Sequence, residues 1–409
     1  MMNIYSNWVP NEIPGTNGIL RFYPLFILLG IIVSILASWI KLKRREIPTE
    51  PFEWSIFLIV PSAIFGSSII GKINSPIIDQ YGFWGYFMIW EPGLAVHGGV
   101  IAGVIVGYFW FRHYSKKYEI SLWIFADAII PNILLGQVIG RWGNFFNHEL
   151  LGQIATASSL DWLPNWLLEN LRKANLDGSP AEGIGIVRHP LFLYESLINL
   201  FSWVLITFVI PKIGMWNSVK PWKKYPKKFI PLWEKDVELL ESEKNWTTPF
   251  KKLYYHRLWK LNCWNQAYFE QTPSKTKKLT VVRKYPEPHL KANNPFFRLM
   301  ERWFKNQWIR IKQLWTQDAK PLEKNANLDK YWMTRVGVQT GSYVVMYSMV
   351  RIILEMFRDE SDILFPYDYV ATYIFLGLGV ITGIILIIFA QVISVRKWRQ
   401  IRWLYEKQY

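Results

Sequence analysis

Long apolar runs are the feature of this chain that most limits what it can fold into. Several runs approach the roughly 20 residues that a helix needs to cross a bilayer, and 51% of the sequence is hydrophobic. A water-soluble protein of this length usually carries more charge and shorter apolar runs. The sequence therefore predicts an all-α, polytopic membrane protein with about seven transmembrane helices, drawn at 21–40, 53–72, 94–112, 120–140, 190–211, 335–356 and 369–393.

Basic residues predict how these spans are oriented. KLKRR follows the first span, FRHYSKK the third, a long basic segment the fifth, and RKWRQIR the seventh. Lys and Arg collect at the cytoplasmic ends of spans. The four basic clusters share one side only if the number of spans is odd and the N-terminus is outside. We therefore expect the C-terminus inside. The first residues lack the basic region of a cleavable signal peptide, so we expect none.

The charge of the chain is concentrated in one segment. Residues 212–330 hold 26 Lys/Arg and 11 Asp/Glu, a net charge of +15, whereas the whole chain carries +16. We therefore divide the chain into spans one to five with outer loops (1–211), a basic, aromatic-rich cytoplasmic insert (212–330), and spans six and seven with a basic tail (331–409). Basic and aromatic residues alternate in the insert, which suits an anionic membrane surface. A domain with a small core is the second reading, and nucleic acid is the least favoured partner.

Cysteine and histidine usage limits the chemistry. Cys263 is the one cysteine, so the chain can form no internal disulfide and no cysteine metal site. The six histidines show no HExxH or similar ligand spacing. We therefore expect neither a metal nor another cofactor.

Four clusters of polar residues lie in or beside the predicted spans, all toward the outer side. In chain order they are HGG at 97–99, GRWGNFFNHELLG at 140–152, RHPLFLYE at 188–195, and YSMVRIILEMFR at 347–358 with Arg351, Glu355 and Arg358. Ionisable residues at membrane depth are costly and usually mark a functional site. Two simpler readings stay open: Arg141 reaches out from a helix end, and Arg351 with Glu355 only locks helices together.

Two of these residues are suited to bind a phosphate. The guanidinium groups of Arg141 and Arg351 match the geometry of phosphate oxygens. Glycines at 98, 99, 140 and 143 allow backbone amides to approach an anion closely. An anion at the outer edge of a bilayer is most simply a phospholipid headgroup, which is the ligand that these residues predict.

The same segments resemble a known family. GRWGNFFNHELLG is similar at every fixed position to the signature of prolipoprotein diacylglyceryl transferases, and HGG, HPLFLYE and the YxxxRxxxExxR pattern resemble three further segments in the same order. RFYP at 21–24 resembles the family's N-terminal segment, which makes Tyr23 the matching tyrosine, although Pro24 replaces the usual glycine. The resemblance covers about 20–211 and 335–393 but not the insert.

The resemblance implies a reaction and a place in the cell. The family transfers the diacylglyceryl group of phosphatidylglycerol to the lipobox cysteine of a preprolipoprotein and releases glycerol-1-phosphate. The implied location is the bacterial cytoplasmic membrane, with seven spans, the N-terminus outside and the active site toward the outer leaflet. The implied partners are phosphatidylglycerol and lipobox signal peptides, in addition to the anionic membrane surface predicted for the insert.

The resemblance also implies roles for single residues. Arg141 and Arg351 match the family positions of the catalytic arginines. The chemistry of the incoming thiol makes His97 the candidate base; in the alternative, the arginines alone lower the thiol pKa and His97 binds the headgroup. His189 is expected to be structural, and His148 falls at a variable position without an assigned role. The predicted substrate-binding residues are Tyr23, Gly98, Gly99, Asn144, Asn147, Glu149, Gly152, Glu195 and Glu355.

Two other functions compete with the transferase. A transporter or channel for an anionic solute would use the same arginines, but it predicts polar residues at the midplane and paired broken helices. A membrane-anchored interaction protein would use the basic insert. Deleting 212–330 separates these ideas, because a transferase should largely keep its activity.

Overall fold

In the part of the chain that it describes, the computed structural model is mostly helical. It describes residues 8–15, 20–45, 47–73, 75–89, 91, 93, 95–118, 120–175, 180, 186–229, 256, 259–260, 263–264, 267, 294–316 and 329–393. The predicted basic tail after 393 and most of 230–293 lie outside these residues. Strand structure in the described part consists of β1 (Ile154–Ala155) and β2 (Val187–Arg188), which pair antiparallel. The all-α class expected from the sequence is confirmed.

Among the described residues, five helices are long and apolar enough to cross a membrane. They are Phe22–Arg44, Glu50–Gly71, Leu122–Phe146, Leu191–Lys224 and Tyr369–Ile393. The remaining two predicted spans are also helical, as α4 (Val96–Tyr118) and α13 (Val338–Glu355). Arginine and other charged side chains lower the hydropathy of α4 and α13, so these two helices lie outside the group of five. The chain is therefore a polytopic membrane protein, and the count of seven remains a prediction.

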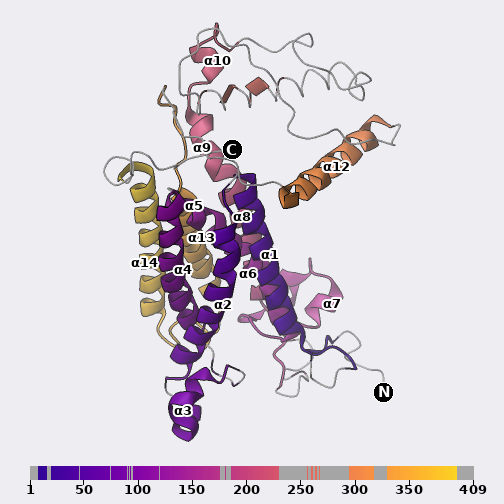
Figure 1. The fold of residues 1–409 in the computed structure, drawn as a ribbon. Helices are drawn as coiled ribbons and strands as arrows, with labels where there is room; N and C mark the ends of the chain where they lie inside the picture. The colour runs from indigo at the N-terminus through magenta and orange to yellow at the C-terminus, as the bar shows by residue number, and fades with distance from the viewer. Residues whose placement is uncertain are drawn as a thin grey trace. The chain divides into compact units, whose positions relative to one another are not determined.

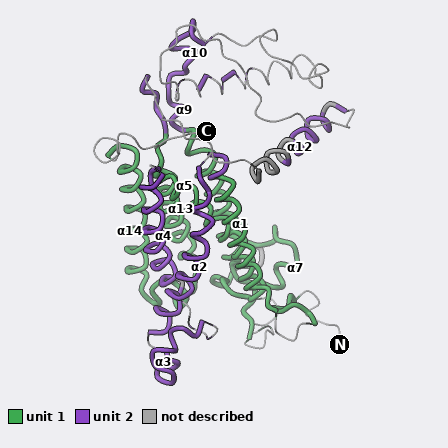
Figure 2. Tube along the Cα trace, viewed as in Figure 1, with its two compact units in different colours: residues 1–41, 123–212, 334–399 green, residues 42–122, 213–333, 400–409 purple. Residues whose placement is uncertain are grey.

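The chain forms two compact units that alternate along the sequence (Figure 2). The first comprises 1–41, 123–212 and 334–399, and the second comprises 42–122, 213–333 and 400–409. The domain boundaries predicted at 212 and near 331 thus lie close to positions where the chain passes from one unit to the other. The chain also passes between the units after 41 and after 122, which the sequence analysis did not predict. The three-part division along the chain stays a prediction.

The first unit is a bundle built from α1 (Phe22–Arg44), α5 (Leu122–Ile129), α6 (Ile133–Phe146), α8 (Leu191–Val204), α13 and α14 (Tyr369–Ile388) (Figure 1). Small residues let these helices approach closely. A Cβ on Gly30 of α1 would lie 2.6 Å from the carbonyl oxygen of Gly136 in α6. A Cβ on Gly341 of α13 would meet the carbonyl oxygen of Gly383 in α14 at 3.0 Å. Glycine is thus required where these backbones touch.

Buried polar groups fix the beginning of α13. The carboxylate of Asp127, in α5, is 1% exposed. It accepts hydrogen bonds from the backbone amides of Gly337 at 2.7 Å and Thr340 at 2.8 Å. The first amides of a helix lack partners within the helix. Asp127 therefore serves as the cap of a helix that is distant in sequence, and it sets where α13 starts.

Outside its long helices, the first unit has a small domain at 147–190. A 3₁₀ turn (Ala157–Leu160), α7 (Asn165–Leu168) and the β1–β2 pair enclose an apolar core. That core includes Phe145, Leu160, Leu167, Leu171 and Phe192, which are 0–3% exposed. Since Phe145 and Phe192 belong to α6 and α8, this domain is anchored on two helices of the bundle.

The second unit contains a helix pair and part of the insert. In the pair, α2 (Glu50–Gly71) packs along α4, and α3 (Pro76–Tyr81) with the 3₁₀ turn Gly82–Phe87 connects them. The insert contributes α10 (Pro221–Lys224) and α12 (Pro295–Thr316), while α9 (Ile210–Asn217) begins in the first unit. Phe229, Trp259, Cys263, Trp264 and Tyr331 form a buried aromatic cluster in this unit. This cluster agrees with the second reading of the insert, a domain with a small core, while the membrane-surface reading stays a prediction.

Candidate functional site

Helix α6 carries the first part of the predicted site. Arg141 and Asn144 lie in its last two turns, and the chain then leaves the helix as the signature loop, which we define as 147–152. His148 and Leu150 adopt positive φ angles of 52° and 56°. This conformation is uncommon for residues with a Cβ. The loop therefore turns sharply and returns its polar residues toward the helix end.

Arg141 is held by a buried glutamate on the neighbouring helix. Its Nη2 donates to Oε1 of Glu195, in α8, at 2.6 Å. The Glu195 side chain is 0% exposed, whereas that of Arg141 is 23% exposed. Arg141 Nε and Glu195 Oε2 are buried and have no hydrogen-bond partner in the described part of the chain. The pair thus fixes one edge of the guanidinium, and two buried polar atoms beside it lack a protein partner, which is uncommon in a folded protein.

Helix α13 provides a second pair of the same kind. Arg351 Nη2 donates to Oε1 of Glu355 at 2.5 Å across one helical turn. Glu355 is 0% exposed, and Arg358 Nε approaches the same oxygen at 3.8 Å. Burial and the nearby charge of Arg351 lower the pKa of Arg358. The carboxylate holds Arg351 by a hydrogen bond and attracts Arg358 from a longer distance, while the three residues keep a net positive charge.

The two pairs belong to one electrostatic cluster. The charges of Arg141 and Glu195 both act on Arg358, as do those of Arg351 and Glu355. We call these five residues the arginine–glutamate cluster. Three guanidinium groups and two carboxylates leave a net charge of +1, and each carboxylate already contacts an arginine. The arrangement therefore suits an anion and disfavours a metal cation.

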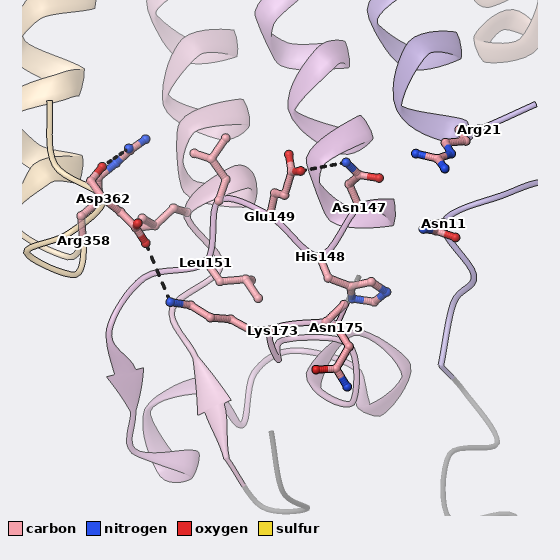
Figure 3. A pocket seen from close by; sticks show the side chains of 13 residues that line it. Asn11, Arg21, Asn147, His148, Glu149, Leu151, Lys173, Asn175, Arg358 and Asp362 are labelled. Carbon is pink, nitrogen blue, oxygen red and sulfur yellow. Dashed lines mark hydrogen bonds and ion pairs between the residues drawn. The ribbon is translucent and has the colours of Figure 1, made fainter. Parts of the chain in front are cut away.

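The signature loop places a third carboxylate near this cluster. Glu149 Oε1 accepts a hydrogen bond from Asn147 Nδ2 at 2.8 Å, which Figure 3 shows as a dashed line. Its Oε2 lies 3.4 Å from Nδ2 of Asn144. The charges of Glu149 and Arg141 both act on the hydroxyl group of Tyr23, at the start of α1. The structure thus brings together predicted residues that are more than 100 positions apart in the sequence.

Gly152 lies where three segments meet. A Cβ on Gly152 would lie 2.3 Å from the carbonyl oxygen of Phe357, which directly precedes Arg358. The Gly152 amide donates to the carbonyl of His189 at 2.8 Å, and its own carbonyl accepts from Arg188 Nη1 at 2.9 Å. The same Arg188 nitrogen lies 2.9 Å from Asp359 Oδ2. Gly152 is thus required for close packing of the signature loop against the end of α13.

Arg188 and Asp359 are residues that the sequence analysis missed. They connect β2 with the segment after α13, next to two predicted site residues. Lys173 joins them, with its Nζ 3.1 Å from Asp359 Oδ2. Their positions in the sequence could have identified them, because Arg188 begins the RHPLFLYE segment and Asp359 directly follows Arg358.

A pocket of about 880 Å³ opens beside the signature loop (Figure 3). Its volume is in the range of small-molecule sites. Polar groups from four parts of the first unit line it, and Glu149 and Arg358 connect it with the cluster. The lining residues are Asn11, Arg21, Asn147, His148, Glu149, Leu150, Leu151, Lys173, Ala174, Asn175, Leu191, Arg358 and Asp362.

The histidines at the site fall into two groups. His148 is buried, stacks on Trp8 at 3.8 Å between ring centroids, and has its ring nitrogens 3.0–3.3 Å from two backbone carbonyls. Burial lowers its pKa, although its hydrogen bonds with the carbonyls of Val9 and Asn170 oppose that shift. Burial also lowers the pKa of His189. His148 is thus held between an aromatic ring and two backbone carbonyls. The structural role expected of His189 stays a prediction.

His97 and its two glycines belong to the second unit. His97 is exposed in the first turn of α4. A Cβ on Gly98 would lie 2.2 Å from the carbonyl oxygen of Gly66 in α2, and one on Gly99 would lie 2.4 Å from Oγ of Ser67. These glycines are therefore required for packing α4 on α2. Their role in binding a substrate, and that of His97 as a base, stay predictions.

Comparison with known proteins gives the family. The sequence pattern of the family described as prolipoprotein diacylglyceryl transferase matches residues 16–222. The phosphatidylglycerol–prolipoprotein diacylglyceryl transferase of Malacoplasma penetrans is 35% identical over 207 residues, which cover 46% of this chain and 57% of the relative. The protein of the same name from Ureaplasma parvum is 33% identical over 214 residues, covering 47% and 62%. That from Streptococcus pneumoniae is 32% identical over 201 residues, covering 49% and 70%.

The match has a limit that bears on the site. The chain spans about three fifths of the length of the first two relatives that it matches. Arg141, Glu149 and Glu195 lie inside the region that matches the family, whereas Arg351 and Glu355 lie after it. The structure adds these last two residues, because it brings α13 into the same cluster as α6 and α8. With half of its length matching the family's sequence pattern, the chain belongs to the prolipoprotein diacylglyceryl transferase family.

Proposed function

We propose that this chain transfers the diacylglyceryl group of phosphatidylglycerol to the cysteine thiol of a preprolipoprotein lipobox. The observation that carries the proposal is the arginine–glutamate cluster, in which two fully buried glutamates hold Arg141 and Arg351 within one group of charges. The names of the relatives supply the two substrates. The product would be a lipid-modified precursor, as required at the start of bacterial lipoprotein maturation.

The reaction explains why arginines are needed. The cysteine sulfur attacks the glycerol carbon of the diacylglyceryl group that carries the phosphate, and a C–S bond forms. The C–O bond to the phosphate breaks, and its electron pair leaves on the oxygen of glycerol-1-phosphate. That oxygen gains negative charge in the transition state. Guanidinium groups that are already fixed in position stabilise this charge without reorganisation.

The glutamates of the cluster act on the arginines and not on the reacting atoms. Glu195 holds Arg141, and Glu355 lies between Arg351 and Arg358. An arginine side chain has about 2 kcal/mol of rotamer entropy to lose on binding, and a buried carboxylate removes much of this freedom in advance. We therefore assign Glu195 and Glu355 as positioning residues for the phosphate site.

The remaining predicted residues surround this centre. Tyr23, Asn144, Asn147 and Glu149 would contact the glycerol hydroxyls or the phosphate, because their polar atoms lie beside the cluster. Gly152 would keep the signature loop close to Arg358. The thiol, with an unperturbed pKa of about 8.5, needs a base or a cationic neighbourhood to react.

His97 is the proposed base for that thiol. Histidine is the side chain that most often takes up a proton as a general base. Gly98 and Gly99 would position it by fixing the first turn of α4. A positive site such as the cluster favours the thiolate as well, so the base lowers the barrier without carrying the reaction alone.

The membrane arrangement completes the proposal. Five helices can span a bilayer by length and composition, and we propose that α4 and α13 add two more spans. The basic clusters then place the N-terminus outside and the C-terminus inside. The cluster would face the outer leaflet of the bacterial cytoplasmic membrane, where exported precursors arrive. The basic insert would contact the anionic surface on the inner side.

The proposal is tested by following both products. Purified protein is incubated with phosphatidylglycerol and a lipobox peptide, and mass spectrometry measures the peptide and the released phosphate ester. We expect the peptide to gain one diacylglyceryl mass for every glycerol-1-phosphate released, and a cysteine-to-serine peptide to gain none. Peptide without added mass, with phosphatidylglycerol intact, would refute the transferase. Movement of an anionic solute across vesicles in that case would favour the transporter instead.

A further inference from the structure

Helix α12 separates its basic and apolar residues onto two faces. In the linear sequence FFRLMERWFKNQW the two types alternate. At 3.6 residues per turn, however, Phe297, Met300 and Phe304 lie on one face. Arg298 and Lys305 lie on another. The described side chains therefore form an amphipathic helix, which the alternating letters conceal.

The apolar face of α12 is the exposed one. Among its described side chains, Phe297, Trp303, Phe304 and Trp308 are 58–68% exposed. On the polar side, Arg302 is only 7% exposed. A helix of a water-soluble domain buries its apolar face and exposes its charges. At these positions α12 instead exposes its apolar side chains and buries a charged one. A further surface must therefore cover its aromatic residues.

The residue types indicate what this surface is. Nucleic acid would require the basic and aromatic residues on one face, whereas α12 segregates them. A transmembrane position is disfavoured by the charges, and α12 is not among the five helices that can span a bilayer. A helix with Trp, Phe and Leu on one face and Lys and Arg on the other is typical of the membrane interface. The spans of this chain also ensure that a membrane is present.

We propose that α12 lies in the plane of the membrane surface, with its aromatic face in an anionic bilayer. Phe297, Met300 and Phe304 would insert below the headgroups, while Arg298 and Lys305 would contact lipid phosphates. The helix carries five basic residues and one acidic residue, which complements an anionic lipid. That this lipid is phosphatidylglycerol rests on the proposed function, whereas insertion of the helix does not.

The proposal is tested with spin labels on the full chain in nanodiscs. Cys263, which is buried in the aromatic cluster of the insert, is first replaced by alanine. Met300→Cys and Lys305→Cys then provide labels about 140° apart around the helix. Collision rates with oxygen, which dissolves in lipid, and with a water-soluble nickel complex measure the surroundings of each label. Nanodiscs contain phosphatidylglycerol or only zwitterionic lipid.

We expect the label at 300 to lie roughly 5–10 Å into the boundary between headgroups and acyl chains, with frequent oxygen and rare nickel collisions. The label at 305 should show the opposite pattern. The depth at 300 should decrease in zwitterionic lipid and with Arg298→Glu, but not with the matched Arg298→Lys.

Two results would overturn the proposal. Equal nickel access at 300 and 305 in phosphatidylglycerol nanodiscs would mean that α12 remains in water. Protection of the label at 300 from both oxygen and nickel would mean that protein, such as a second copy of this chain, covers the face. Transferase activity is measured on the same samples, so a failure of the proposed function is recognised separately.

Discussion

Replacing Arg351 with alanine should destabilise the protein in addition to stopping transfer. Its partner Glu355 is 0% exposed, and the two side chains are 2.5 Å apart. Removing one partner of a buried ion pair costs about 3–5 kcal/mol, because the other charge stays buried and unpaired. Arg358 lies 3.8 Å from the same carboxylate oxygen and remains as a weaker partner. We therefore expect a loss near 3 kcal/mol, the lower end of this range.

The matched control removes both charges. In Arg351→Ala with Glu355→Gln, no unpaired carboxylate is left, so most of the lost stability should return. Activity should not return, because the guanidinium that would stabilise the leaving phosphate is still missing. Loss of one such preorganised donor typically lowers kcat about 10²–10³-fold. Stability and catalysis should thus separate between the single and the double variant.

Two measurements decide this prediction. Denaturant unfolding in detergent micelles gives the change in unfolding free energy, and mass spectrometry of a lipobox peptide gives the transfer rate. Recovery of near-normal transfer in the double variant would refute the assignment of Arg351 to the phosphate. A single variant as stable as the original protein would contradict the claim that breaking this buried ion pair is costly.

Three further predictions concern packing, pH and the insert. Gly152→Ala should lower transfer about tenfold or more, because its Cβ would meet the carbonyl oxygen of Phe357 at 2.3 Å. Gly377→Ala, whose Cβ would enter open space, is the control, and equal activity of the two variants would refute this reasoning. Because burial lowers the pKa of His148, the histidine contributes stability that is present above pH ~6.5 and lost as the pH falls. Melting temperatures measured from pH 8 to 5 should therefore decline less in His148→Gln than in the original protein, and parallel curves would contradict this. Replacing 230–328 with a short flexible linker should leave most transfer activity in the peptide assay, and its complete loss in a folded protein would assign the insert to catalysis.

The sequence predicted the helices of the fold because membrane helices are defined by composition. Apolar runs of about 20 residues identify spans without knowledge of their neighbours. The two predicted spans that lie outside the five membrane-length apolar helices, α4 and α13, are those with polar residues such as His97 and Arg351. The close contacts between helices were not predictable, since Gly30 and Gly136 approach each other only in the folded bundle.

The candidate site could be predicted from the sequence where its residues lie in one short motif, but not where the fold brings distant residues together. Arg141, Asn144 and Glu149 lie within nine residues of one another, and their spacing suffices to find them. The contact between Arg188 and Asp359 joins residues 171 positions apart. No local pattern encodes such a pairing. The burial of Glu195 and Glu355 likewise depends on helices packing around them, so the proposal that they position the arginines rests on the structure.

The most direct test of the account is the mass of a lipobox peptide after incubation with phosphatidylglycerol and either the original protein, Arg141→Ala or Arg351→Ala. We predict one added diacylglyceryl group with the original protein and none above background with either variant, although both variants insert into membranes. Near-normal transfer by either variant would contradict the claim that paired guanidinium groups stabilise the departing phosphate.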